Sequence, residues 1–156
     1  PAPSGKTFGV VLERIGRETP AVEHLLSVPG IGPLTATALV AFVGDVRRFA
    51  SGRRFSSYLG LVPKERSSGE TRRLGRISKR GDAYLRTLLI HGARAVLWAA
   101  RKKARPDALS AWALELEAKR GHNKAAVALA NKLARIAWAV WRDGRNYQPR
   151  AAGIAA

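Results

Sequence analysis

The stretch that most constrains the fold is VPGIGP, residues 28–33. Thr19 is suited to cap a helix and Pro20 to occupy its first position, so a helix is predicted from there to the turn. Pro29 and Gly30 must end that helix. A second helix is predicted over 34–43, with these apolar residues on one face: Leu34, Ala38, Leu39 and Phe42.

The turn itself, hydrophobic-Gly-hydrophobic-Gly before a helix, resembles the helix-hairpin-helix motif. Gly30 and Gly32 would let the backbone approach a phosphate without a Cβ in the way. The N–H groups of the turn and of the second helix would then point at the anion, while Ile31 plugs the turn into the core. An ordinary helix–helix turn that uses glycine for its geometry is the alternative. We predict phosphate contacts at Gly30, Ile31 and Gly32 that position a duplex without reading its sequence.

The rest of the chain also has mainly helical periodicity. Asp82 is a good N-cap, residues 121–123 predict a turn, and Gly144 predicts a helix stop. Residues 64–81 predict a basic loop or a short hairpin, with strand-like alternation over 71–77. The remaining helices are predicted over 49–61, 82–104, 108–119 and 124–142. The predicted fold class is all-α, a helical bundle that contains a helix-hairpin-helix motif and a basic loop or small β-ribbon.

The domain organisation follows from the same pass along the chain. Residues 1–19 predict a tail that contains the end of an upstream helix. Residues 20–147 predict one domain, and 148–156 a disordered tail. Methionine is absent, even at position 1, which indicates a fragment or a processed chain.

Composition limits the classes of function. The chain has 156 residues, of which 46% are hydrophobic, so it can bury a core. Its 28 Lys and Arg against 11 Asp and Glu give a net charge of +17, for which nucleic acid is the default partner. A membrane-surface protein is disfavoured, because the arginines concentrate in a loop and no apolar run is long enough to span a bilayer. The absence of cysteine excludes disulfides and thiolate metal sites.

The positive charge concentrates in residues 64–105, which hold 13 Lys and Arg against 3 Asp and Glu. Within them lies RSSGETRRLGRISKRGD, residues 66–82, which is either a phosphate-gripping loop without chemistry or the site of a serine nucleophile. A serine can attack a phosphodiester and keep the ester's energy in a phosphoserine link, and arginine forks suit the charge of that transition state. Gly69 would let a strand approach Ser68 closely. The candidate phosphate-binding cations are Arg66, Arg72, Arg73, Arg76, Lys79 and Arg80.

A metal site finds little support in the sequence. Glu65, Glu70 and Asp82 are scattered through the basic region, where local pairing is expected. The three histidines show no ligand spacing: His24, His91 and His122. We therefore predict no metal ligands in this chain.

Several motifs in a fixed order resemble the C-terminal transposase domain of the IS110/IS116/IS902 insertion-sequence family, including its IS1111 branch. These are PGIGP at 29–33, YLGLVP at 58–63, SSG at 67–69, RISKRGD at 76–82 and YLR at 84–86. The resemblance covers Leu25 to Leu97, and residues 123–144 also resemble the family's closing helix. Each piece is weak alone, and the combination is specific.

The resemblance implies a two-part DNA recombinase of the cytoplasm of bacteria or archaea, associated with the nucleoid when bound. An N-terminal RuvC-like domain, absent from this chain, would bind Mg²⁺. The C-terminal domain would carry the catalytic serine, and a structured bridge RNA and a homo-oligomer would bring two DNAs together. The family's serine precedes a glycine after YLGLVP, which matches Ser68, with Ser67 as the second choice. By this reading the isolated chain binds nucleic acid but does not recombine it.

Overall fold

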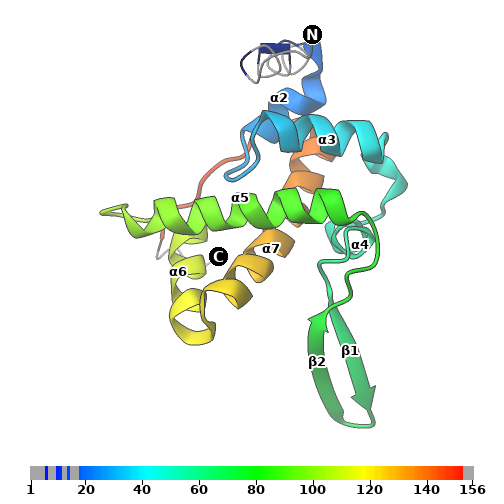
Figure 1. The fold of residues 1–156 in the computed structure, drawn as a ribbon, viewed down its shortest axis with the longest axis vertical. Helices are drawn as coiled ribbons and strands as arrows, with labels where there is room; N and C mark the ends of the chain where they lie inside the picture. Colours follow the sequence, from blue (N-terminus) through cyan, green and yellow to red (C-terminus); the bar gives the residue numbers. More distant parts are fainter. Residues whose placement is uncertain (1–5, 7–9, 12–13, 15–17, 153–156) are drawn as a thin grey trace.

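The structure is a computed structural model that describes residues 6, 10–11, 14 and 18–152. Helices make up most of this part of the chain, together with one antiparallel two-stranded ribbon, as predicted (Figure 1). The elements are α2 (Pro20–Leu26), α3 (Pro33–Val43), the 3-10 turn η1 (Val46–Arg48), α4 (Gly52–Tyr58), β1 (Pro63–Ser68), β2 (Thr71–Ile77), α5 (Ala83–Arg101), α6 (Ala108–Arg120) and α7 (His122–Asp143).

Two long helices, α5 and α7, organise the core. Each has an apolar stripe of buried leucine, valine and alanine, and the two pack against each other, while α4 and α6 pack on α7. In Figure 1, α5 crosses the molecule between the α2–α3 pair and the α6–α7 pair, and the β1–β2 ribbon projects away from the helices. The ribbon is thus an arm attached to a helical body.

The turn at residues 28–31 packs on α5. Ile31 is buried, as predicted, and Gly30 has a φ of +78°, a backbone conformation that favours glycine. A Cβ added to Gly30 would lie 2.7 Å from the carbonyl oxygen of Gly92 in α5. The glycine is therefore required for backbone packing between the turn and α5.

A second pair of glycines fixes the base of the ribbon. Gly60 precedes β1 and Gly81 follows β2, and both have positive φ. A Cβ on Gly81 would lie 1.8 Å from the carbonyl oxygen of Tyr58, and one on Gly60 would lie 2.2 Å from that of Arg80. The backbone N–H of Lys79 also donates to the carbonyl of Gly60 at 3.1 Å. The two ends of the arm are thereby held together where they leave the helices.

The predicted helix limits need four corrections. Thr19 has an extended backbone but its side chain makes no capping hydrogen bond. The helix predicted over 49–61 is only α4, because Ser51 caps its start through a bond from the N–H of Arg54 and Gly60 ends the run. The helix predicted to residue 104 ends at Arg101, and the turn predicted at 121–123 is reduced to Gly121, after which α7 begins at once.

One predicted helix face is also partly wrong. Ala38 and Leu39 of α3 are buried, whereas Leu34 and Phe42 are largely exposed. Thr35 and Ala36 are buried in their place, because the face of α3 that meets the core is rotated from the most apolar one. Asp82, by contrast, caps α5 as predicted, accepting hydrogen bonds from the two N–H groups of Tyr84 and Leu85.

The segment after α7 returns along the body. Gly144 ends α7 in the left-handed conformation, as predicted. The N–H of Tyr147 donates to the hydroxyl of Ser27 at 2.7 Å, and the N–H of Ala108 donates to the carbonyl of Arg150 at 2.9 Å. In the described part of the tail predicted over 148–156, Arg150 is thus bonded to the start of α6.

Candidate nucleic-acid interface

The predicted nucleophile lies at the tip of the ribbon. Ser68 is the last residue of β1 and pairs with Thr71, and the turn between them consists of Gly69 and Glu70. Ser68 is exposed, and Gly69 has a φ of +61° with nothing within 4 Å of the position a Cβ would take, so the tip is open on the side of the turn. A polymer could therefore reach the hydroxyl of Ser68 without any movement of the helices.

Four of the predicted residues have side chains outside the part of the chain that the structure describes: Arg66, Ser67, Arg72 and Arg73. Their backbone belongs to the ribbon, where Arg66 pairs with Arg73 and Ser67 with Arg72. The strand register therefore places these residues in the two steps directly before the tip.

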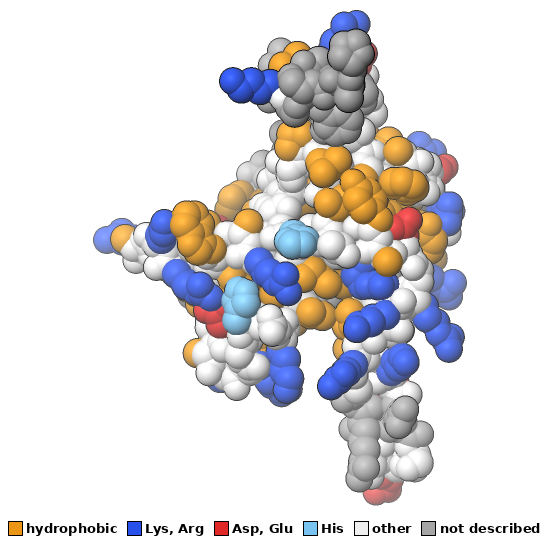
Figure 2. Space-filling model, in the orientation of Figure 1, with side chains coloured by type: hydrophobic (Ala, Val, Ile, Leu, Met, Phe, Trp, Pro, Cys, Tyr) orange, Lys and Arg blue, Asp and Glu red, His pale blue; other side chains and the backbone are white. Residues whose placement is uncertain are grey.

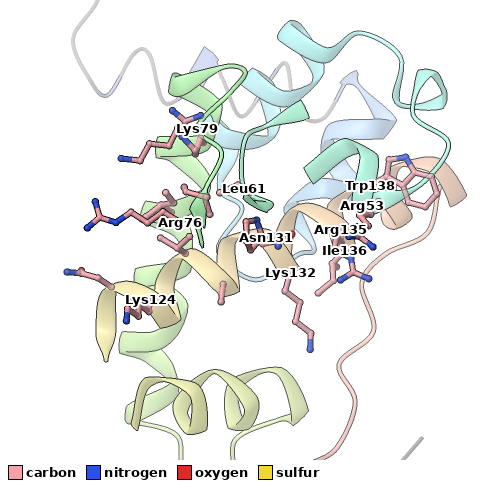
Figure 3. A pocket seen from close by; sticks show the side chains of 18 of the residues that line it. Arg53, Leu61, Arg76, Lys79, Lys124, Asn131, Lys132, Arg135, Ile136 and Trp138 are labelled. Carbon is pink, nitrogen blue, oxygen red and sulfur yellow. The ribbon is translucent and has the colours of Figure 1, made fainter. Parts of the chain in front are cut away.

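A long open groove runs between the base of the ribbon and α7. Its volume is about 1620 Å³. Its walls come from α4, from the base of the ribbon where β1 starts and β2 ends, from α5, from Trp112 and Arg120 of α6, and above all from α7. In Figure 3, Arg76 and Lys79 come from the end of β2 and the segment after it, whereas Lys132 and Arg135 come from α7. The groove thus collects side chains from segments far apart in sequence.

The wall of this groove has one sign of charge. None of the described residues that line it is Asp or Glu. The Lys and Arg that line it are Arg53, Arg76, Lys79, Arg86, Arg94, Arg120, Lys124, Lys132 and Arg135. Figure 2 shows Lys and Arg gathered over the same parts of the body and around the base of the ribbon. A cleft lined by one sign of charge focuses the field and raises the local concentration of counter-ions, so a polyanion is the ligand that this wall favours.

Lys132 shows the effect of this crowding on a single group. Its ammonium lies 4.1 Å from the centre of the Trp112 ring. Burial, and then repulsion from the Arg135 guanidinium, lower the pKa of Lys132 from its ordinary value. An anion bound beside Lys132 and Arg135 would relieve that repulsion.

The described residues predicted in and just after the ribbon fall into three places. Arg76 and Lys79 line the groove, and Ser68 and Gly69 form the ribbon tip. Arg80 is exposed on the segment after β2 and does not line the groove.

The turn glycines lie elsewhere. Gly30 borders a separate small cavity of about 230 Å³ with Lys103, which already bonds Asp107 and Ser110. Gly32 is the N-cap residue of α3, is exposed, and has no atom within 4 Å of the position that a Cβ would take. The N–H of Ile31 donates to the carbonyl of Val28 at 3.1 Å, so Gly32 is the predicted contact of this turn that has open space beside it.

Sequence reasoning missed the α7 side of the groove. Lys124, Asn131, Lys132 and Arg135 recur at spacings of seven, one and three residues, which puts them on one face of a helix. This spacing can be read from the sequence, but the phosphate-binding cations were predicted from the high density of charge in residues 64–105. Arg86 and Arg94 of α5 also line the groove.

Other kinds of site find no support in the described part of the chain. No three His, Asp or Glu side chains among those residues come close enough to hold a metal ion. None of the helices described is both long and apolar enough to cross a bilayer.

Comparison with known proteins adds a family likeness. Residues 22–108 match the sequence profile described as "Transposase IS116/IS110/IS902 family". The chain is 53% identical over 82% of its length to a "Probable family 20 transposase" of Pseudomonas aeruginosa. It is 44% identical over 88% of its length to the transposase for insertion sequence element IS1111A of Coxiella burnetii, and 42% identical over 78% to that for IS1328 of Yersinia enterocolitica.

These relatives are much longer than the chain. The matched part covers 37% of the first two proteins and 36% of the third. The chain therefore corresponds to about one third of each relative.

Proposed function

Because the chain belongs to the IS116/IS110/IS902 family of transposases, we propose that it is the DNA-binding, serine-bearing part of an insertion-sequence transposase. In this proposal the groove holds nucleic acid and the ribbon presents Ser68 to a phosphodiester. The observation that carries it is the groove wall, which lacks acidic side chains among the described residues and ends at the arm that bears Ser68.

The proposed reaction balances without a further reactant. The hydroxyl oxygen of Ser68 attacks phosphorus and loses its proton, and the leaving sugar oxygen gains one. The products are a serine–phosphodiester link and a free sugar hydroxyl. Because the ester is conserved, the reverse step can join the phosphate to a different strand. Arginines near the tip would stabilise the negative charge of the transition state.

Two further parts of the proposal concern the rest of the protein. We propose that the chain is the C-terminal part, and that it acts with an N-terminal RuvC-like domain, a structured bridge RNA and a second copy of the protein. The Mg²⁺ of that reaction would be held by the RuvC-like domain. The described residues of this chain group no set of acids that fits the ion. In this proposal the chain binds and orients the DNA, and Ser68 attacks it.

The turn at residues 30–32 is proposed as a helix-hairpin-helix phosphate contact on its Gly32 side. The space beside Gly32 is open, whereas the space beside Gly30 is filled by the backbone of Gly92. The N–H groups of the first turn of α3, which starts at Pro33, would favour an anion at that end of the helix. This contact would add to the groove in positioning a duplex.

The test uses the complete transposase and the DNA of its element. Replacing Ser68 with Ala should abolish strand exchange while the Kd for DNA stays within about twofold, because the change removes no charge. The matched control is Ser67→Ala, which should retain exchange. Normal recombination by the Ser68→Ala protein would exclude Ser68 as the nucleophile. If the Ser67→Ala protein also recombined normally, only a non-catalytic DNA- or RNA-binding module would remain.

A further inference from the structure

The outward face of α5 carries a row of exposed rings. Tyr84, His91 and Trp98 follow one another at intervals of seven residues, which is close to two turns of a helix, so their backbone positions lie nearly in line along one face, about 10 Å apart. Tyr84 is 47% exposed and Trp98 is 59% exposed, and His91 is also exposed. Large rings at regular spacing on one face are unusual for a surface that meets only water.

The same face is positively charged. No Asp or Glu occurs between residues 83 and 106. The ammonium of Lys102 lies 3.5 Å from the centre of the Trp98 ring. Arg94, between His91 and Trp98, is exposed and also lines the groove, so the row lies next to the groove along α5. In Figure 2 this face shows Lys and Arg with hydrophobic side chains among them.

This mixture suits one class of partner better than others. Lysine is depleted in protein–protein interfaces, whereas proteins that bind single strands combine a basic surface with rings on which bases stack. A duplex would not use the rings, because its bases are already stacked on one another. Unpaired nucleotides are the ligand that can use both the rings and the cations.

We propose that the outward face of α5 binds unpaired nucleotides, whose bases stack on Trp98 and Tyr84 while their phosphates meet Arg94 and Lys102. The strand would pass from the groove over Arg94. This surface shares Arg94 with the groove, lies on α5 rather than on the ribbon tip, and does not depend on Ser68.

The test measures the binding of fluorescein-labelled oligodeoxythymidine and oligouridine to the complete protein, with a duplex of mixed sequence in parallel. The Trp98→Ala variant should weaken binding of one or both single strands at least about fivefold, since each base–ring stack contributes that much or more. Duplex binding should stay within twofold. Comparing the loss of affinity for the two oligomers shows whether this face prefers single-stranded DNA or single-stranded RNA.

Controls separate stacking from charge and from damage to the fold. Leu26→Ala, an exposed apolar truncation on α2, should change nothing, and Trp98→Phe should recover most of the affinity. The salt dependence should be the same for Trp98→Ala as for the parent, but shallower for Lys102→Ala. Single-strand Kd values within twofold of the parent for both Trp98→Ala and Tyr84→Ala would overturn the proposal.

Discussion

Gly30 and Gly92 touch backbone to backbone. A Cβ on Gly92 would lie 2.0 Å from the carbonyl oxygen of Gly30, and one on Gly30 would lie 2.7 Å from the carbonyl oxygen of Gly92. The turn that the sequence predicts to contact phosphate is therefore also a packing contact of the α2–α3 pair with α5. No flexible side chain can yield at this point, because both partners are main chain.

Gly92→Ala should accordingly destabilise the fold. Alanine in a helix interior normally gains about 1 kcal/mol over glycine, but the clash with Gly30 should reverse the sign and cost roughly 1–3 kcal/mol. Urea unfolding measures the change. Gly32→Ala is the matched control, since no atom lies within 4 Å of its Cβ position, and it should cost less than about 1 kcal/mol. Equal stability of the two variants would show that the backbone packing of Gly30 on Gly92 does not matter.

The groove should be visible in the salt dependence of DNA binding. Lys124 and Arg135 are exposed and line the groove from α7. Replacing both with Ala should weaken binding of any duplex and reduce the slope of log K against log salt by about 0.9 for each phosphate that is no longer neutralised. The control pair, Lys119 and Arg145, is exposed outside the groove wall and should leave the slope unchanged. An unchanged slope of log K against log salt in the variant with Ala at Lys124 and Arg135 would mean that this part of α7 does not contact phosphate.

Glu117 should give the fold an acid-sensitive contact. Its carboxylate accepts hydrogen bonds from Arg101 at 2.9 Å and is 2.9 Å from the His122 ring, and these two partners lower its pKa from 4.5 to about 2. The folded state therefore binds this proton more weakly than the unfolded chain. The stabilisation is present above about pH 4.5 and is lost as the pH falls towards about 2.

The measurement is the thermal midpoint of Glu117→Gln against the parent at several pH values. The variant should melt about 1–4 °C lower at neutral pH, and this gap should close as the pH falls through that range. Glu115→Gln, which removes an exposed pair with Lys119, should show a smaller gap. A gap that is constant with pH would show that the charge of Glu117 does not matter.

The sequence predicted what local patterns determine. Asp82 and Gly144 delimit their helices as predicted, because capping and a left-handed stop depend only on neighbouring residues. The start of α7 at His122 was missed because Gly121 alone makes the break that the pattern spread over three residues. The exposure of Phe42 depends on how α3 is rotated against the core, which no pattern within α3 reveals.

The candidate site was predictable only in part, for the same reason. The ribbon and Ser68 could be located because the motif is contiguous. Arg76 and Arg135 line the same groove although they are 59 residues apart in the sequence. They are brought together by the packing of α5 on α7 and by the close backbone contacts of Gly60 and Gly81 at the ribbon base. The packing role of Gly30 likewise depends on Gly92, which lies 62 residues away in the sequence.

The proposed reaction depends above all on Ser68 forming the covalent link to DNA, and chemical identification of the linked residue tests this. The complete transposase would be trapped on its DNA with the link intact, the DNA digested, and the peptides analysed by mass spectrometry. We expect a nucleotide remnant on Ser68 of the peptide that contains residues 67–69. A remnant on Ser67 or on any other residue, or recombination without a covalent link, would refute the assignment.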